Sequence, residues 1–366
     1  MIIPELPDYL TSLGGGEYKG LIIALFTLSA GLSRPFSGKL ADSIGRIPVM
    51  IIGASVCCLV GLLYPLVSFV GGFLFLRFIH GFSTGFKPTG SSAYVADIVP
   101  YHKRGEAMGL HSLFGSLGMA AGPAFGGWVA TVFSINVIFY VSAFTAIFSV
   151  IILLKLKETV KNKVPMSWSL LRLKKDEIIE KRVLLPSGIL FLLAFPFGVV
   201  LTIIPDFSTH LGIANKGLFF GVFTLASLGI RLVAGKTSDR YGRVPVMQMA
   251  SITLVCAMIL IAFSDSEVML LSSGVLFGCA VGMYSPTTSA WVIDRSLDAF
   301  RGRALATMYI CLEAGIGIGA LISGYLYAND TANFRLVFLF SAGVALIAFG
   351  FLIFVQRDKN NEAVVS

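Results

Sequence analysis

The chain has 366 residues, of which 56% are apolar and only 13% are charged, and its mean hydropathy is +0.85. This much apolar surface cannot be buried in one water-soluble core, so the composition excludes an ordinary soluble protein. The net charge of +8 would suit a nucleic-acid partner, but the basic residues fall mainly in every second loop between apolar segments. We therefore expect the lipid bilayer to surround the chain and exclude nucleic acid as a partner.

Apolar segments follow one another along the chain, each close to the roughly 20 residues that a helix needs to cross a bilayer. They predict an all-helical, multi-pass membrane protein. The basic loops lie on one side together with the C-terminus, and the positive-inside rule makes that side cytoplasmic, in the inner (plasma) membrane. The eleven complete spans that we expect cover residues 20–37, 48–68, 71–95, 106–128, 133–154, 184–204, 217–234, 245–263, 268–292, 304–326 and 334–355.

The chain matches itself at an offset of 197 residues, which pairs Arg34 with Arg231 and continues without an insertion through the later spans. Such a long repeat indicates two duplicated helical halves in the same orientation. We expect an N-terminal half at 1–154 and a C-terminal half at 184–366. Between them, residues 155–183 are rich in basic residues and predict a cytoplasmic linker, with an amphipathic segment at 168–179 that lies on the membrane or protein surface.

A glycine-rich loop follows the first complete span and recurs after the seventh. The sequence GKLADSIGRIPV at 38–49 and its copy GKTSDRYGRVP at 235–245 resemble the signature loop of the major facilitator superfamily. The resemblance implies two six-helix halves and a loop that clamps their cytoplasmic ends together; a turn that only sets topology is the alternative. Asp97 and Asp294 end their spans nearby and are expected to pair with Arg46 and Arg243. The gating residues are thus Gly38, Asp42, Gly45, Arg46, Asp97, Gly235, Asp239, Gly242, Arg243 and Asp294.

The third complete span contains Arg77, His80 and Lys87, which share one face of a helix. An intramembrane charge usually faces an aqueous cavity, so we expect all three to line one, with Gly81 and Gly85 receiving a neighbouring helix. The segment is similar to the family's arginine-containing motif that is linked to proton transfer. Two alternatives stay open: a structural hydrogen-bonding role for His80, and extension of the Lys87 side chain to the cytoplasmic surface.

The fourth complete span holds an unbroken match to the antiporter signature of the same superfamily, which separates exporters from importers. Small residues favour close helix crossing, and Pro123 removes a backbone donor where the halves would rock. The motif comprises Gly118, Gly122, Pro123, Gly126 and Gly127. His111 lies on the same stripe and should face a packed seam, either as a structural residue or as a proton site.

Glu313 is the one carboxylate well inside a predicted span. Because a buried carboxylate stays protonated until water or a partner reaches it, Glu313 is a candidate for proton coupling, with a structural hydrogen bond as the alternative. Tyr284, Thr288 and Trp291 occupy the span equivalent to that of Arg77, and we expect them to line the cavity opposite it.

No phosphate loop, nucleophile elbow or metal-ligand spacing is present in the sequence, so we expect no enzyme activity, cofactor or metal. An ion gradient would then supply the energy. We predict a monomeric secondary transporter that exports a small organic molecule in exchange for protons. The alternatives are an importer or facilitator of a nutrient on the same fold, and a sensor that moves nothing.

The two halves differ at their beginnings. About twenty apolar residues precede Pro205 in the second half, whereas only Met1, Ile2 and Ile3 precede Pro4 in the first. We therefore expect the reading frame to start late and to lack the first span; a genuine eleven-span protein is the alternative.

Overall fold

The computed structural model describes residues 1–99, 104–160, 163–167, 170, 172, 178–213, 215–296 and 301–365. All regular structure in these residues is helical. The first half begins with short helical turns, η1 (Ile3–Glu5), α1 (Leu6–Ser12) and η2 (Gly16–Tyr18), and η3 (Tyr64–Leu66) follows the second of its long helices. Its long helices are α2 (Lys19–Ser43), α3 (Arg46–Leu63), α4 (Val70–Ile98), α5 (Arg104–Val132) and α6 (Ile135–Leu154).

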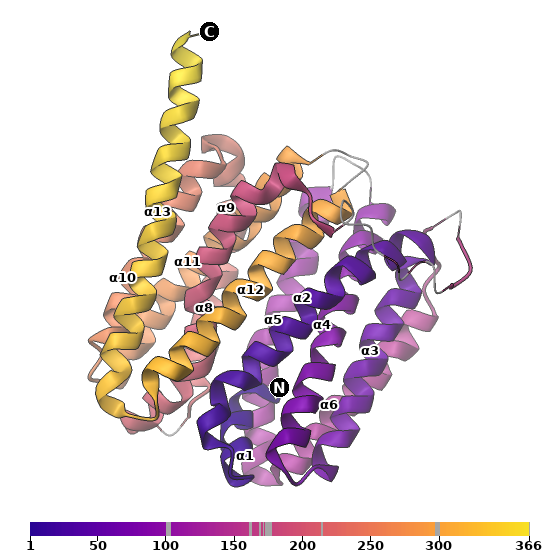
Figure 1. Ribbon diagram of the computed structural model, residues 1–366, viewed down its shortest axis with the longest axis vertical. Coiled ribbons are helices and arrows are strands. Elements are labelled where there is room, and N and C mark those ends of the chain that lie inside the picture. The colour runs from indigo at the N-terminus through magenta and orange to yellow at the C-terminus, as the bar shows by residue number, and fades with distance from the viewer. Residues whose placement is uncertain are drawn as a thin grey trace.

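In the described residues, the second half contains six long helices and the short 3-10 turn η8 (Thr331–Asn333), and a further 3-10 turn, η6 (Lys181–Val183), ends the linker. The long helices run side by side, and the C-terminal one extends well beyond its neighbours (Figure 1). They are α8 (Leu184–His210), α9 (Leu218–Tyr241), α10 (Arg243–Ala262), α11 (Glu267–Arg295), α12 (Arg301–Tyr327) and α13 (Phe334–Val365).

Each of the eleven expected spans corresponds to one of these long helices. Eight of the helices in the described residues are long and apolar enough to cross a membrane by themselves, or nine if α9 counts as one bent span. Of the eleven helices that match the expected spans, α4 and α5 are the two that do not meet this test within the described residues. Helix α4 contains Arg77, His80 and Lys87. Because polar side chains are costly to expose to lipid, these residues should face other helices of the protein.

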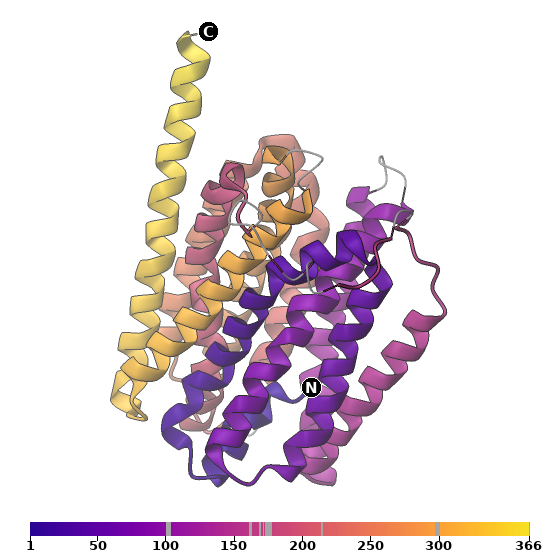
Figure 2. The ribbon, with the colours of Figure 1, turned by 45° about the vertical axis from the view of Figure 1, so that its right-hand side comes forward.

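The two halves pack their helices in the same pattern. In the first half α4 lies against α2 and α3, and α6 lies against α3; in the second half α11 lies against α9 and α10, and α13 lies against α10. The halves meet along two equivalent seams, α2 against α12 and α9 against α5. Figures 1 and 2 show α2 and α12 side by side in both views. The repeat in the sequence is thus a repeat in space.

Glycines hold the repeated helix pairs at close range. A Cβ atom at Gly81 would collide with the carbonyl oxygen of Phe26, and one at Gly278 would collide with that of Phe223. The two contacts are related by the 197-residue offset. The expectation that Gly81 receives a neighbouring helix is confirmed, because only a residue without a side chain fits at this crossing.

The connections between the long helices lie at two ends of the molecule. The α2–α3 and α9–α10 turns lie at the end where the described linker residues and the C-terminus are found, which we call the linker end (Figure 1). The α1 turns and the α10–α11 connection lie at the other end, which we call the opposite end.

Candidate functional site

A buried ion pair joins the two halves across the α2–α12 seam. The Nη2 atom of Arg34 donates to Oε1 of Glu313 over 3.1 Å, and the two side chains are only 2% and 7% exposed. Gly31 faces Glu313 across the seam, where an added Cβ would lie 3.6 Å from the Cβ atom of Glu313, at ordinary van der Waals contact. Glu313 thus lies at the interface between the two halves and not in the interior of one half.

Arg34 has further partners that hold its guanidinium group in place. Its Nη1 atom donates to Oγ1 of Thr89 on α4 over 3.1 Å, and its guanidinium carbon lies 4.3 Å from the ring centre of Tyr309 on α12. Removing one member of a buried pair typically costs about 3–5 kcal/mol, because the other charge is left without compensation. Protonation of Glu313 would weaken the same contact by removing one of its charges.

The second seam contains the repeat equivalent of this contact. Arg231 on α9 corresponds to Arg34, and its Nη1 atom donates to Oγ of Ser116 on α5 over 2.8 Å. Ser116 lies 197 residues before Glu313, so both arginines cross to equivalent positions of the opposite half. One arginine meets a carboxylate there and the other meets a hydroxyl.

Arg77 and His80 do not face an open cavity, contrary to the expectation. Arg77 is 1% exposed, its Nε atom donates to the carbonyl oxygen of Ile22 on α2 over 3.0 Å, and its guanidinium group lies over the ring of Phe26. The Nδ1 atom of His80 shares a 3.2 Å hydrogen bond with the hydroxyl of Tyr64. Both side chains therefore join α4 to its neighbours, which agrees with the structural alternative for His80.

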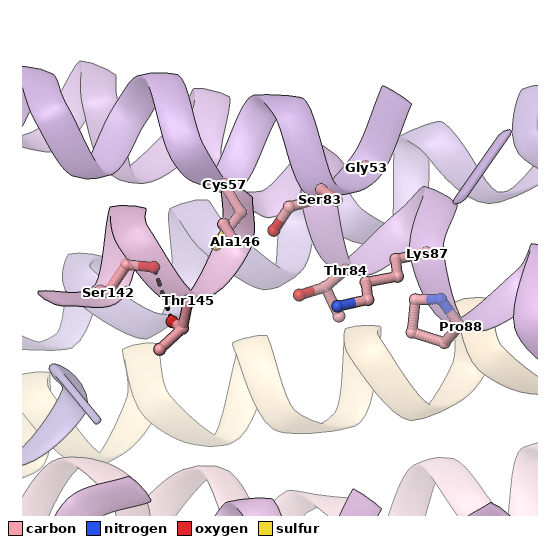
Figure 3. A pocket seen from close by; sticks show the side chains of 10 residues that line it. Gly53, Cys57, Ser83, Thr84, Lys87, Pro88, Ser142, Thr145 and Ala146 are labelled. Carbon is pink, nitrogen blue, oxygen red and sulfur yellow. Dashed lines mark hydrogen bonds between the residues drawn. The ribbon is translucent and has the colours of Figure 1, made fainter. Parts of the chain in front are cut away.

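Lys87 lies apart from Arg77 and His80 and lines a pocket of about 220 Å³ between α3, α4 and α6. Figure 3 shows the Lys87 side chain beside Thr84 and Pro88, with Cys57 and Ser142 further along the pocket. The pocket belongs to the first half alone. The prediction that Lys87 shares one cavity with Arg77 is wrong, because the intervening turn of α4 packs against α2.

The residues expected opposite Arg77 are also buried within their own half. Tyr284, Thr288 and Trp291 are at most 3% exposed. The hydroxyl of Thr288 donates to the backbone carbonyl of Tyr284 over 2.8 Å and lies 3.5 Å from the sulfur of Met247 on α10. They do not line an open cavity, since this face of α11 packs against α10 and the other helices of the second half.

The loop residues at the linker end form two equivalent networks. The guanidinium of Arg46 contacts Asp42 and also donates through Nε to Asp97 over 3.1 Å. Arg243 contacts Asp239 over 2.5 Å and donates through Nε to Asp294 over 2.9 Å. The expected pairs Arg46–Asp97 and Arg243–Asp294 are therefore present. Each network lies within one half, so in this conformation neither clamps the halves together.

The glycines of these loops have different roles. Gly45 and Gly242 have φ angles of 124° and 91°, in the region that favours glycine, as expected for the two turns. Gly38 and Gly235 lie inside α2 and α9, and a Cβ at either would meet no described heavy atom within 4 Å. Close approach is therefore not the reason for glycine at these two positions.

Ion pairs between the halves occur at the opposite end instead. Lys19 contacts Asp206 over 2.9 Å, and Lys216 contacts Asp8 over 3.0 Å. The two lysines are again separated by 197 residues, and each bridges to the other half. The described side chains thus connect the halves electrostatically at this end and at the Arg34–Glu313 pair.

The antiporter motif on α5 is packed at one end only. A Cβ at Gly122 or Gly126 would approach the backbone of Met1, and one at Gly127 would lie 3.8 Å from Oε1 of Glu5. At Gly118 nothing described lies within 4 Å. Pro123 lies inside the helix, as its position in the sequence requires. The expected continuous seam is therefore only partly formed.

His111 lies at the linker-end half of the same stripe and is half-buried. Its Nε2 atom shares a 3.2 Å hydrogen bond with Oγ of Ser91 on α4. This contact fits the structural alternative for His111, because it joins two helices of one half through a hydroxyl group.

The linker contacts both halves through carboxylates. Glu158 accepts hydrogen bonds from the backbone N–H groups of Arg46 and Ile47, each over 3.0 Å, at the start of α3. Glu180 accepts from Nε of Arg303 on α12 over 3.0 Å. Most of the amphipathic segment expected at 168–179 lies outside the described residues. In the described part of the chain, no group of three His, Cys, Asp or Glu side chains could hold a metal ion.

Arg34 is the residue that sequence reasoning missed. Its match to Arg231 was visible in the repeat, and an arginine in the middle of an apolar span is a signal by itself. The sequence does not show that Glu313 is the partner of Arg34, because the two residues are 279 positions apart.

Comparison with known proteins agrees with this architecture. Among similar chains, Multidrug resistance protein 2 of Bacillus subtilis (strain 168) is 27% identical over 378 aligned residues, which cover 99% of this chain and 92% of the relative. The multi-drug resistance efflux pump PmrA of Streptococcus pneumoniae is also 27% identical, over 88% of this chain and 83% of the pump.

Solved structures show the same fold at lower identity. The human organic anion transporter MFSD10 superposes with a TM-score of 0.74 at 20% identity, over 96% of this chain and 89% of that one. The D-xylose-proton symporter gives 0.75 at 16% identity, over 95% and 89%. The family model of the Major Facilitator Superfamily matches residues 1–214 and 186–366, which together span the whole chain. The chain therefore belongs to the Major Facilitator Superfamily of membrane transporters.

Proposed function

We propose that this protein exports a small organic molecule in exchange for protons, and that Glu313 is the carboxylate that binds and releases the proton. The observation on which the proposal depends is the ion pair between Glu313 and Arg34 across the α2–α12 seam. A proton on Glu313 changes the attraction between the halves, so its binding is linked to their relative movement.

The residues around the pair fit a reversible contact. When Glu313 is neutral and the halves separate, Arg34 keeps the hydroxyl of Thr89 on α4, in its own half, as a partner, whereas Tyr309 moves away with α12. The charge of Arg34 is therefore not left without any neighbour when the halves separate. When the proton leaves, the carboxylate again attracts Arg34 and the seam closes.

The direction of transport rests on two further observations. The relatives at 27% identity are named for multidrug resistance and efflux, and residues 118–127 match the antiporter signature. We place the linker end, with its basic loops and the C-terminus, in the cytoplasm, since basic loops remain on that side. The contacts of Lys19 and Lys216 then close the outer side of the molecule in this conformation.

The test is transport by the purified protein in proteoliposomes with an imposed pH gradient. A panel of cationic, neutral and anionic fluorescent dyes first identifies a transported probe. Glu313→Gln should then abolish gradient-driven accumulation of that probe while exchange of labelled for unlabelled probe continues. Glu267→Gln is the matched control, because Glu267 is exposed in the first turn of α11 and should behave as the wild type. Proton-driven flux that is unaltered in Glu313→Gln would remove Glu313 from the mechanism.

A further inference from the structure

The surroundings of Arg34 and Arg231 can be compared residue by residue because the repeat has a constant offset. Arg34 contacts Thr89, Tyr309 and Glu313. At the same offset, the positions around Arg231 are occupied by Pro286, Ser112 and Ser116. The hydroxyl of Thr89, the aromatic ring and the carboxylate have all been exchanged for smaller or less polar side chains.

Arg231 therefore has a different electrostatic environment from Arg34. Among the described residues, its hydrogen-bond acceptor is Oγ of Ser116, and no carboxylate forms an ion pair with it. Its Nε atom is buried and has no hydrogen-bond partner in the described part of the chain, and the same holds for the Nε atom of Arg34, so the carboxylate is what distinguishes the two sites. A guanidinium group remains charged in a membrane, so its site is favourable for an anion.

The two seams also differ in how tightly they close. At the α2–α12 seam, a Cβ at Gly317 would lie 2.5 Å from Oγ1 of Thr27. Among the described residues, α5 and α9 approach each other closely over a shorter stretch than α2 and α12 do. Helix α9 also bends by 43° between Leu218–Arg231 and Val233–Tyr241, directly beside the arginine. Arg231 thus lies at a bend in the looser of two otherwise equivalent contacts.

We propose that Arg231 binds the carboxylate of an anionic substrate, in the place equivalent to the one that the Glu313 carboxylate occupies at Arg34. The planar guanidinium group offers parallel N–H donors that suit a carboxylate, and the hydroxyl of Ser116 adds a further polar contact. The substrate class is therefore a small organic monoanion. This assignment rests on the proposed transport function but not on Glu313 as the proton site.

The test is equilibrium binding of radiolabelled salicylate to the whole protein in lipid nanodiscs. Unlabelled benzoate should displace the label, whereas the isosteric neutral benzamide should not. Arg231→Gln should weaken salicylate binding by about tenfold or more, because it removes a charge-assisted hydrogen bond, and Arg231→Lys should retain part of it. Arg240→Gln is the control, since Arg240 is exposed on the same helix.

Ser116→Glu separates loss of the site from loss of the fold. It rebuilds the Arg34–Glu313 arrangement at the second seam, so it should raise the melting temperature of the protein while abolishing salicylate binding. Absence of salicylate binding to the wild type, equal displacement by benzamide and benzoate, or unchanged binding in Arg231→Gln would each overturn the assignment. If proton-driven export of a cationic or neutral dye persists in those cases, the transport function stands and only the anion site fails.

Discussion

Single residues determine the turns at the linker end. Gly45 has φ and ψ angles of 124° and 160°, and Gly242 has 91° and 161°. This region of backbone conformation is essentially restricted to glycine. At Gly45 a side chain would also collide with Oε2 of Glu158, whereas the nearest atom at Gly242 is 3.8 Å away. The two turns therefore share a backbone requirement but differ in their surroundings.

We expect Gly45→Ala and Gly242→Ala each to lower the free energy of unfolding by about 1–3 kcal/mol, with the larger loss at Gly45. Gly38→Ala is the matched control within the same motif. It lies inside α2 with free space around it, so alanine should be neutral or stabilising by up to about 1 kcal/mol. Melting temperatures in detergent measure all three, and an equal loss in Gly38→Ala would contradict the backbone argument.

At the scale of helices, the start of α3 is stabilised by a segment distant in sequence. The carboxylate of Glu158 accepts from two backbone N–H groups in the first turn of α3, where the helix dipole is positive. Position 355 of the repeat, equivalent to 158, is a valine on α13. Within the described residues the start of α10 therefore has no counterpart of this contact, and the linker distinguishes two otherwise equivalent turns.

The Glu158 contact predicts a pH-dependent stability. Burial alone would raise the pKa of Glu158, but the backbone N–H groups of Arg46, Val160, Ile47 and Thr159 lower its pKa below the ordinary 4.5. A carboxyl whose pKa is lower in the folded state stabilises the protein above the ordinary value, and this stabilisation is lost as the pH falls below 4.5 through the lowered pKa.

Glu158→Gln should therefore lower the melting temperature near neutral pH, by the equivalent of about 0.3–2 kcal/mol. The difference from the wild type should shrink as the pH falls below 4.5. Melting curves of both proteins over this pH range provide the measurement, with Glu267→Gln as the exposed control. A difference in melting temperature between the two proteins that grows as the pH falls would contradict this prediction.

At the scale of the whole molecule, two equivalent lysines hold the halves together at the opposite end. The Lys19–Asp206 pair is more buried than the Lys216–Asp8 pair, in which Asp8 is 61% exposed. Exposed pairs contribute only about 0–1 kcal/mol, so the Lys19 contact should be the stronger of the two. Opening of this end requires both pairs to separate.

We expect Lys19→Gln to shift the protein towards a conformation open at this end, more than Lys216→Gln does. Spin labels introduced by Ser12→Cys and Asp265→Cys, one in each half and both exposed at this end, report the separation once the five native cysteines have been replaced by serine. The measured distances should lengthen in Lys19→Gln, less in Lys216→Gln, and most in the double variant. Identical distance distributions in all four proteins would show that these pairs do not hold the end closed.

The sequence is sufficient to predict the helical fold and the equivalence of the halves, because hydropathy and the 197-residue repeat can both be found by inspecting the sequence alone. It also predicted the pairs Arg46–Asp97 and Arg243–Asp294, and it singled out Glu313 as a carboxylate inside a span, whose role in proton coupling stays a prediction. The sequence placed Arg77 in an open cavity, which is wrong. A helical wheel shows which residues share a face of one helix, but not which neighbouring helix that face contacts. The sequence also did not predict that Arg34 and Arg231 each contact the opposite half. The repeat shows which positions are equivalent, but not which helices of the two halves lie against each other.

The repeat has a carboxylate at only one of its two equivalent seam positions, Glu313 but not Ser116. A carrier that stores its proton on this single group takes up one proton in each turnover. Exchange of that proton for a neutral molecule moves one elementary charge across the bilayer, and exchange for a monoanion moves the equivalent of two. Since each charge is worth about 2.3 kcal/mol per 100 mV, export of an anion would be electrogenic and driven chiefly by the membrane voltage.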